Sequence, residues 1–330
     1  LGDVYKRQEL DTAPVANFIY YLAEGNLLFT TTLTKKLISN GKITQSGQGW
    51  IIQGELGIED MPEVVCTMMS AEFDRLPPEV QQIYKVACIF GKTFAELTLR
   101  DALSGQRDPA SIRKDLGILE KNGLIRLIKA SPYPVYQFQP ALLQEVVYQA
   151  LSPEDRSKWH LKIGETLEKE NQDNFESVAE QLAYHFLHAQ KPALAARYYQ
   201  QAGQKALQQH ANHEASMLLR KALALADDEI QTSQLLADLG LALDAQSKHE
   251  EAIATWKEAA QIYERLGNFD RVARLYAWMA RAAWWSDTLD QNLICCLEGM
   301  KKVQDKGESA DIAYLIHECG RSYYFNGQME

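Results

Sequence analysis

The stretch LADLGLALDAQSKHEEAIATWKEA, residues 236–259, decides the fold of the second half of the chain. It contains two apolar helical patterns separated by a short polar break at residues 245–248. Small residues such as Gly240 and Ala252 stand at fixed spacing from the large Trp256. Two antiparallel helices need small side chains where they cross and large ones in the gap to their neighbours. The stretch therefore predicts a pair of packed helices.

The same spacing recurs along the chain and matches the tetratricopeptide repeat, a helix pair of about 34 residues. Its small and large positions are filled by Leu236, Leu239, Gly240, Leu243, Ala252, Trp256 and Ala259, and again by Ala179, Leu182, Ala183, Phe186, Ala195, Tyr199 and Ala202. Shorter matches are Ala215, Leu219 and Ala222, then Ala280, Ala283, Cys296 and Gly299. We therefore predict an α-solenoid of tetratricopeptide-like repeats over residues 152–330. Ile316, Cys319, Gly320 and Tyr323 would start a last repeat that is truncated before its second helix.

The first half of the chain has a mixed pattern, since eight of the ten prolines precede residue 150. Pro near the first turn and Asn-Gly at the end are typical helix boundaries. Three helices and then two strands are expected over residues 76–90, 94–103, 108–123, 124–129 and 135–138. Three helices followed by a β-hairpin form a winged helix, which we assign to residues 71–151. The fold class is therefore mainly α.

Composition excludes several classes of protein. The chain has 330 residues, a net charge of −10 and 46% hydrophobic residues, so it is neither disordered nor fibrous. No apolar run approaches the roughly 20 residues of a membrane helix. Five cysteines without a framework favour a reducing cytoplasm. The acidic total, most of it on residues 151–330, argues against a protein that mainly coats nucleic acid.

Several stretches resemble a known bacterial family. They are EGNLLF at 24–29, ACIFGKTF at 87–94, LGILEKNGLI at 116–125, YQFQPALLQEVVYQAL at 136–151 and RSKWH at 156–160. They are similar to the C-terminal part of signal-transduction (STAND, AAA-type) ATPases that carry a winged helix and tetratricopeptide repeats, as in class III adenylate/guanylate cyclase–ATPase–tetratricopeptide proteins. Two departures stand out: Leu27 replaces a usual Pro, and Pro140 replaces a usual His. The second departure puts nucleotide contact from this segment in question.

The resemblance implies that residues 9–70 are the C-terminal remnant of an ATPase module, whose ATP and Mg²⁺ would bind upstream of this chain. Residues 1–8, LGDVYKRQ, look like adapter-derived, non-native sequence. The fragment would have no catalytic, cofactor or metal site and would not be an enzyme. It would couple partner binding on the repeats, through the winged helix, to an upstream nucleotide switch and effector. Two alternatives remain: part of an intact cyclase or kinase, and a DNA-binding transcription regulator of the same ATPase class.

Four weaker patterns favour structural explanations. Gly91-Lys92-Thr93 lacks the first glycine of a phosphate loop, because Val86 stands there. Cations that could contact DNA are Arg107, Arg113, Lys114, Lys121, Arg126 and Lys129, but acidic residues share their helix. The pairs His185/His188 and His210/His213 have helical spacing without further metal ligands. Cys295-Cys296 are expected to be buried thiols.

A sharper candidate is the face formed by the first helix of each repeat. Early repeats would place Ser177, Glu180, Tyr184 and Leu187, then Gln234, Ala237, Leu241 and Asp244 on it. The last two repeats would place basic and aromatic residues there, in particular Arg274, Arg281, Trp284, Tyr314, His317, Arg321 and Tyr324. Arginines hold carboxylates in bidentate fashion, and aromatic side chains pack on peptides. This pattern predicts a groove for a protein or peptide partner, favouring an acidic one, against the alternative of an ordinary solvated face.

Overall fold

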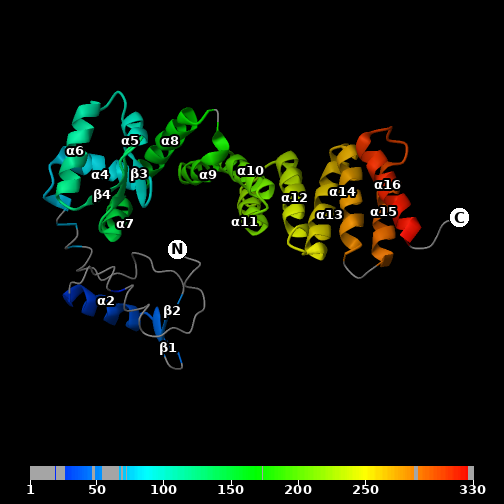
Figure 1. The fold of residues 1–330 in the computed structure, drawn as a ribbon, viewed down its shortest axis with the longest axis horizontal. Coiled ribbons are helices and arrows are strands. Elements are labelled where there is room, and N and C mark those ends of the chain that lie inside the picture. Colours follow the sequence, from blue (N-terminus) through cyan, green and yellow to red (C-terminus); the bar gives the residue numbers. More distant parts are fainter. Residues whose placement is uncertain are drawn as a thin grey trace. The chain divides into compact units, whose positions relative to one another are not determined.

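The structure is a computed structural model that describes residues 19, 27–46, 49–53, 67, 70–71, 73–172, 174–285 and 289–325. Within these ranges the chain is mostly helical and divides into two compact units, Leu1–Thr166 and Leu167–Glu330 (Figure 1). The segment expected to be adapter-derived, residues 1–8, lies outside the described residues, as does much of the expected ATPase remnant. The predicted domain boundaries stay predictions.

The first unit begins with helix α2 (Leu27–Ser39) and a hairpin of β1 (Ile43–Ser46) and β2 (Gly49–Ile52). The two strands are antiparallel, with Ile43 opposite Ile52. Leu33 and Leu37 are buried one helical turn apart on α2. Their spacing places both side chains on one face of the helix.

The rest of the first unit contains the helices and strands expected from the sequence, with two additions, a short strand, Thr93–Ala95, and a helix, Ala141–Ala150. In chain order the elements are α4 (Pro78–Cys88), β3 (Thr93–Ala95), α5 (Glu96–Ala102), α6 (Pro109–Lys121), β4 (Ile125–Lys129), β5 (Val135–Phe138), α7 (Ala141–Ala150) and α8 (Pro153–Glu170). Helix α8 runs into the second unit. The three strands form an antiparallel sheet in the order β3-β5-β4.

Strand β3 corrects the expectation of a helix over residues 94–103. Thr93–Ala95 pairs with β5 in the register Phe94 opposite Tyr136, and the helix begins only at Glu96. The Phe94 ring is buried and lies 5.5 Å from the Tyr136 ring and 5.2 Å from the Phe138 ring. The burial of this aromatic cluster favours the strand over the local helical pattern.

The second unit is a series of helices, each packed against the next. They are α9 (Ala179–His188), α10 (Pro192–Gln208), α11 (Asn212–Leu223), α12 (Glu229–Asp244), α13 (His249–Arg265), α14 (Phe269–Ala283), α15 (Leu289–Val303) and α16 (Ala310–Phe325), with a short 3₁₀ turn, η2 (Phe175–Ser177), before α9. Along this part of the chain α10 contacts α12, and α14 contacts α16. The helices thus alternate between two layers: the α10 layer (α10, α12, α14, α16) and the α11 layer (α11, α13, α15).

Side-chain contacts connect the helices within each layer. In the α10 layer, Gln204 on α10 donates to Asp238 on α12 at 2.8 Å. In the α11 layer, Arg220 on α11 faces Glu251 on α13 at 3.4 Å, and Lys302 on α15 faces Glu264 on α13 at 2.7 Å.

The helix crossings follow the small-against-large pattern of the sequence. A Cβ atom built on Gly240 would lie 2.6 Å from the indole Cε2 of Trp256, and one built on Gly203 would lie 2.8 Å from Cγ of Leu219. Both glycines are 16 residues before their partners. The Trp256 indole is fully buried and donates from Nε1 to the backbone oxygen of Ala237 at 3.0 Å. These contacts confirm that α12 and α13 form the predicted helix pair.

The position of α10 changes the predicted repeat register. The predicted register makes α9 a first helix and α10 its second helix. The structure places α10 beside α12, in the layer of the first helices. Gly203 and Leu219 therefore make α10 and α11 a pair equivalent to α12 and α13. Ser177, Glu180, Tyr184 and Leu187 precede or belong to α9, so they are not part of the α10 layer.

Candidate functional site

The seven predicted groove residues lie on or directly after α14 and α16, two helices of the α10 layer that contact each other. His317, Arg321 and Tyr324 are exposed. Arg274, Arg281, Trp284 and Tyr314 are half-buried. The structure thus brings the predicted residues onto two neighbouring helices, with their side chains in part accessible.

Arg274 joins the two helices. Its Nε donates to Oδ1 of Asp311 on α16 at 2.8 Å, and a second guanidinium nitrogen contacts the same oxygen. The guanidinium carbon also lies 5.5 Å from the centre of the Tyr314 ring. The guanidinium of such an arginine already has a carboxylate as hydrogen-bond acceptor and an aromatic ring as a cation–π partner. Arg274 therefore acts first as a contact between α14 and α16.

The other cations of the groove also have carboxylates nearby. Arg281 lies 4.0 Å from Asp244 on α12, and Asp244 in turn contacts His249 Nδ1 at 2.8 Å. Arg321 lies 3.2 Å from the buried Glu318. Asp244 was among the residues predicted for this face. Asp311 and Glu318 were not, because their positions in the repeat register were not counted as groove positions.

This pairing corrects the expected electrostatics of the groove. The sequence pattern predicts a basic surface, but Asp311, Asp244 and Glu318 offset the charges of the three arginines. An acidic partner would have to compete with these carboxylates for the same guanidinium groups. The accessible surface of α14 and α16 therefore combines paired charges with aromatic rings.

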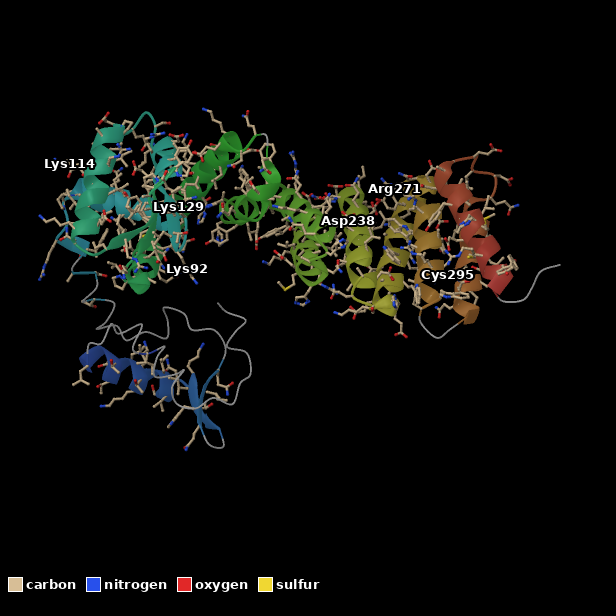
Figure 2. All side chains as sticks on the ribbon, viewed as in Figure 1. Lys92, Lys114, Lys129, Asp238, Arg271 and Cys295 are labelled. Carbon is tan, nitrogen blue, oxygen red and sulfur yellow. The ribbon has the colours of Figure 1, made fainter. Side chains whose placement is uncertain are left out.

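Asp238 on α12 is a further polar residue of this layer. Its Oδ2 accepts hydrogen bonds from Gln204 at 2.8 Å and Gln200 at 3.4 Å, both on α10. Burial raises the pKa of this carboxyl above its usual range, and the two amides and the charge of Arg271 on α14 act in the opposite direction. Figure 2 shows Asp238 and Arg271 on α12 and α14. The α10 layer is thus connected by polar contacts from α10 to α16.

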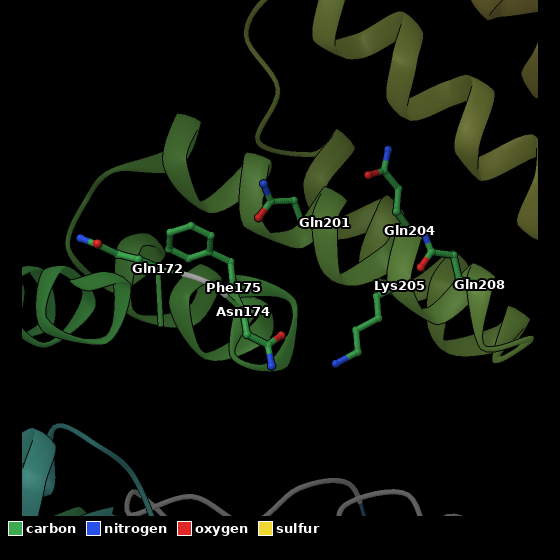
Figure 3. Close-up of a pocket in the computed structure, with 7 residues that line it drawn as sticks. All are labelled: Gln172, Asn174, Phe175, Gln201, Gln204, Lys205 and Gln208. Carbon is green, nitrogen blue, oxygen red and sulfur yellow. The ribbon is translucent and has the colours of Figure 1, made fainter. Parts of the chain in front are cut away.

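An amide-lined pocket adjoins this network at its α10 end (Figure 3). Its volume is about 510 Å³, and it is lined by Gln172, Asn174, Phe175, Gln201, Gln204, Lys205 and Gln208. The side-chain oxygen of Gln201 is buried and has no hydrogen-bond partner among the described residues. Amides both donate and accept, so such a pocket can hydrogen-bond peptide groups in either sense. Sequence reasoning missed it, although the glutamines at 201, 204 and 208 share helical spacing.

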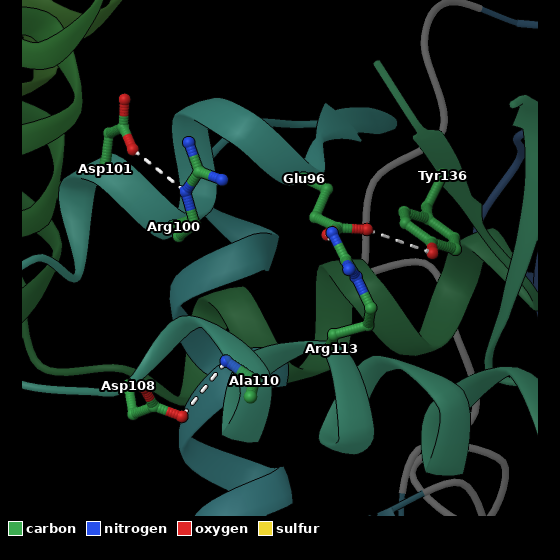
Figure 4. A network of polar contacts seen from close by, with 7 residues as sticks. All are labelled: Glu96, Arg100, Asp101, Asp108, Ala110, Arg113 and Tyr136. Carbon is green, nitrogen blue, oxygen red and sulfur yellow. Dashed lines mark hydrogen bonds and ion pairs between the residues drawn. The ribbon is translucent and has the colours of Figure 1, made fainter. Parts of the chain in front are cut away.

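In the first unit, the residues of the phosphate-loop candidate and two of the cations that could contact DNA have structural roles. Gly91 has a positive φ of 95° and turns α4 into β3, while Val86 lies buried inside α4. Of the cations that could contact DNA, Arg107 pairs with Asp115, and Arg113 donates to Glu96 at 2.9 Å (Figure 4). Glu96 is buried and also accepts from the Tyr136 hydroxyl at 3.5 Å. These arginines stabilise the packing of α6 against its neighbours.

The four histidine candidates lie on or beside α9, α10 and α11, and the two cysteine candidates lie on α15. His185 is buried, and burial lowers its pKa to about 4. His188, His210 and His213 are exposed. Cys295 and Cys296 are buried, and Cys296 Sγ lies 3.3 Å from Ser322 Oγ. Burial raises the pKa of the Cys295 thiol to about 11. Among the described residues, no three His, Cys, Asp or Glu side chains are grouped to hold a metal ion.

Comparisons with known proteins give weak similarities only. No family model and no curated protein matches the chain. Among solved structures, BtubC from P. vanneervenii is 16% identical, with a TM-score of 0.40 over 53% of this chain and 75% of its own. A signal-transduction ATPase with numerous domains (STAND) and a tetratricopeptide repeat sensor, from Pyrococcus horikoshii, is 14% identical, with a TM-score of 0.34 over 98% of this chain. This chain spans about half of that protein, 49% of its length.

Aspartyl phosphate phosphatase F from Bacillus subtilis is 12% identical, with a TM-score of 0.33 over 98% of this chain and 85% of its own. TM-scores this low carry no argument about function. Within the described ranges, no helix is both long and apolar enough to cross a bilayer.

Proposed function

We propose that the helix array of the second unit is a protein-interaction module that binds a partner on the α10 layer. The observation that carries this proposal is the surface shared by α14 and α16, where Trp284, Tyr314 and Tyr324 stand beside paired charges. Aromatic and arginine side chains are the residue types that contribute most to protein–protein binding. Their positions on a two-layer helical scaffold hold them in a fixed pattern.

Selection from a displayed peptide library tests this proposal, with the purified chain as bait at low salt. Peptides that bind the groove are expected to lose about tenfold in affinity for a Tyr324→Ala, Arg281→Ala double variant. Removing Arg281 leaves Asp244 with its contact to His249, so the variant is expected to fold. Arg220→Ala, in an exposed pair of the α11 layer, is the matched control. Equal binding by all three proteins would contradict the proposal.

We further propose that residues 71–151 are a winged helix that follows the end of a STAND-type ATPase module. The order α4, β3, α5, α6, β4, β5 and the sheet order β3-β5-β4 support this proposal. In this scheme partner binding on the repeats would shift the winged helix and, through it, an upstream nucleotide switch and effector. Such coupling requires two states with different partner affinity.

The proposal includes the absence of catalysis by this chain itself. Purified chain is expected to show no ATP hydrolysis and no cyclase activity above a buffer control, and measurable turnover would contradict it. The DNA-binding alternative is tested by fluorescence anisotropy with a duplex at low salt. We expect no saturable binding, because Arg107 and Arg113 hold carboxylates of their own unit.

A further inference from the structure

The amide-lined pocket beside α10 differs in chemistry from the groove on α14 and α16 (Figure 3). Five of its seven described lining residues carry an uncharged carboxamide, and Phe175 contributes an aromatic ring. Lys205 is the one charged residue among them, and it already has an interaction of its own within the chain. Carboxamides donate and accept hydrogen bonds, so the pocket suits a neutral ligand that does both.

Three of the amides form a row along α10. Gln201, Gln204 and Gln208 lie on one stripe of the helix, because their spacing is i, i+3 and i+7. At about 1.5 Å of rise per residue, the row is about 10 Å long. An extended peptide, at about 3.3 Å per residue, spans this length with about three residues. Its hydrogen-bonding groups can therefore meet the amides one after another.

Two oxygens in this row are acceptors for an incoming N–H group. The side-chain oxygen of Gln201 is buried and has no donor among the described residues, and a buried acceptor without a donor costs free energy. The last torsion of a glutamine is broad, so a turn of this amide toward the pocket would bring the oxygen to a ligand. Gln204 donates from Nε2 to Asp238 at 2.8 Å, which orients its amide and leaves its oxygen as an acceptor. A peptide main chain supplies the N–H donors that both oxygens need.

The opposite wall of the pocket comes from the segment that follows α8. It consists of Gln172, Asn174 and Phe175 (Figure 3). An extended chain carries N–H and C=O groups on both of its edges, so it can bond to amides on two walls at once. The main-chain groups of a helix are already paired within the helix. The pocket therefore favours an extended segment over a helical one.

We propose that this pocket binds an extended, uncharged segment of a partner polypeptide by its main chain. The glutamine row of α10 bonds one edge of the segment, and Gln172 and Asn174 bond the other, with Phe175 packed on its face. Main-chain hydrogen bonds supply the affinity in this mode of binding. The site goes beyond the groove on α14 and α16, because it stands at the other end of the α10 layer and uses amides in place of rings and paired charges.

A peptide of three Ser-Gly units, acetylated and amidated at its ends, is the probe, because it offers a main chain with few side-chain contacts. Saturation-transfer NMR with the full chain is expected to show saturable binding. The same peptide with sarcosine in place of each glycine keeps every carbonyl group but loses the glycine N–H donors. It is expected to bind at least about tenfold more weakly. The proposal is overturned if the Ser-Gly peptide does not bind, or if the sarcosine peptide binds equally well.

Gln201→Met tests the site within the protein, because methionine keeps the length of the side chain and removes its amide. Binding of the Ser-Gly peptide is expected to fall about tenfold. The urea midpoint of unfolding is expected to stay the same or rise, because the change removes a buried oxygen without a donor. Gln209→Met is the matched control, since Gln209 is an exposed neighbour outside the lining, and it is expected to leave binding unchanged. A Gln201→Met variant that binds the peptide as the natural chain does would refute the proposal.

The Tyr324→Ala, Arg281→Ala double variant distinguishes the pocket from the groove. It is expected to bind the Ser-Gly peptide as the natural chain does. Loss of this binding would overturn the pocket, since the peptide would then lie in the groove. Tighter binding of a glucose trisaccharide than of the peptide would also overturn it, because hydroxyl groups would then be the preferred ligand. A groove that binds no peptide leaves these expectations unchanged, so the two proposals fail separately.

Discussion

Gly240 shows how a single residue sets the approach of two helices. Any Cβ atom there would overlap the Trp256 indole, which is fully buried and hydrogen-bonded to Ala237. Glycine in a helix interior costs about 1 kcal/mol relative to alanine in intrinsic propensity. The burial of the Trp256 side chain, which the close contact allows, offsets this cost. The sequence pattern predicted this pair, since small and large residues recur at the same offset.

The residue scale gives a matched pair of stability predictions. Gly240→Ala is expected to lower the free energy of unfolding by about 2 kcal/mol, because the overpacking cost exceeds the gain in helix propensity. Gly117→Ala, at an open helical position, is expected to raise it by up to about 1 kcal/mol. Urea denaturation followed by circular dichroism measures both. A stabilising Gly240→Ala would show that the helices do not pack this closely.

His185 gives a prediction of pH dependence. Burial lowers its pKa to about 4 from the ordinary value of 6.5, so between these values the unfolded chain binds a proton that the folded chain does not. Stability is therefore lost as pH falls through this window, by about 2 kcal/mol from this residue at about pH 5. In urea titrations, the His185→Gln variant is expected to lose about 2 kcal/mol less stability than the natural chain between about pH 7 and pH 5. An equal loss in both proteins would contradict this origin.

At the scale of the element, α6 shows how local sequence positions a helix. Asp108 caps it, with its carboxylate accepting from the backbone nitrogens of Ala110 (Figure 4) and Ser111, both at 3.1 Å, and Pro109 fits the first turn. Asn122 and Gly123, with φ of 70° at the glycine, end it. Every one of these boundaries is visible in the sequence, because caps depend on residues within one turn.

The cap supports a prediction at this scale. Asp108→Ala is expected to destabilise the first unit by about 1 kcal/mol, because two backbone N–H groups lose their acceptor. Asp108→Asn keeps an acceptor oxygen, so it is expected to destabilise the first unit by only about a few tenths of a kcal/mol. Thermal unfolding of the three proteins compares them. An alanine variant as stable as the natural chain would mean that the cap contributes nothing.

Two features of the fold could not be predicted from neighbouring residues in the sequence. Thr93–Ala95 forms a strand because β5, whose paired residues lie 40 to 44 positions later, offers both hydrogen-bond partners and aromatic rings. Helix α10 joins the layer of α12, although its own pattern fits either position in a repeat. In both cases the deciding contacts come from residues distant in sequence. The same is true of Asp311 and Asp244, which lie 37 residues from Arg274 and Arg281, whereas Glu318 lies three residues from Arg321 on the same helix.

At the scale of the whole molecule, the chain combines a small α/β unit and a helical array, each with its own core. The sequence predicted the helical array, because periodicity sets it, and the aromatic residues that it assigned to one face lie on or directly after the neighbouring helices α14 and α16. It overestimated the positive charge, because ion pairs between helices do not follow from a repeat register. Partner binding is therefore expected to depend on shape and aromatic contact more than on salt.

The most direct test of the account is a hydrogen-exchange footprint of the chain with a peptide selected for binding at low salt. Protection is expected on α14 and α16, around Trp284, Tyr314 and Tyr324, with the α11 layer and the first unit unchanged. Raising the ionic strength is expected to weaken binding only slightly and to leave the footprint in place, because the arginines of this surface are already paired. Protection confined to α11, α13 and α15, or to the first unit, would contradict the proposed partner surface.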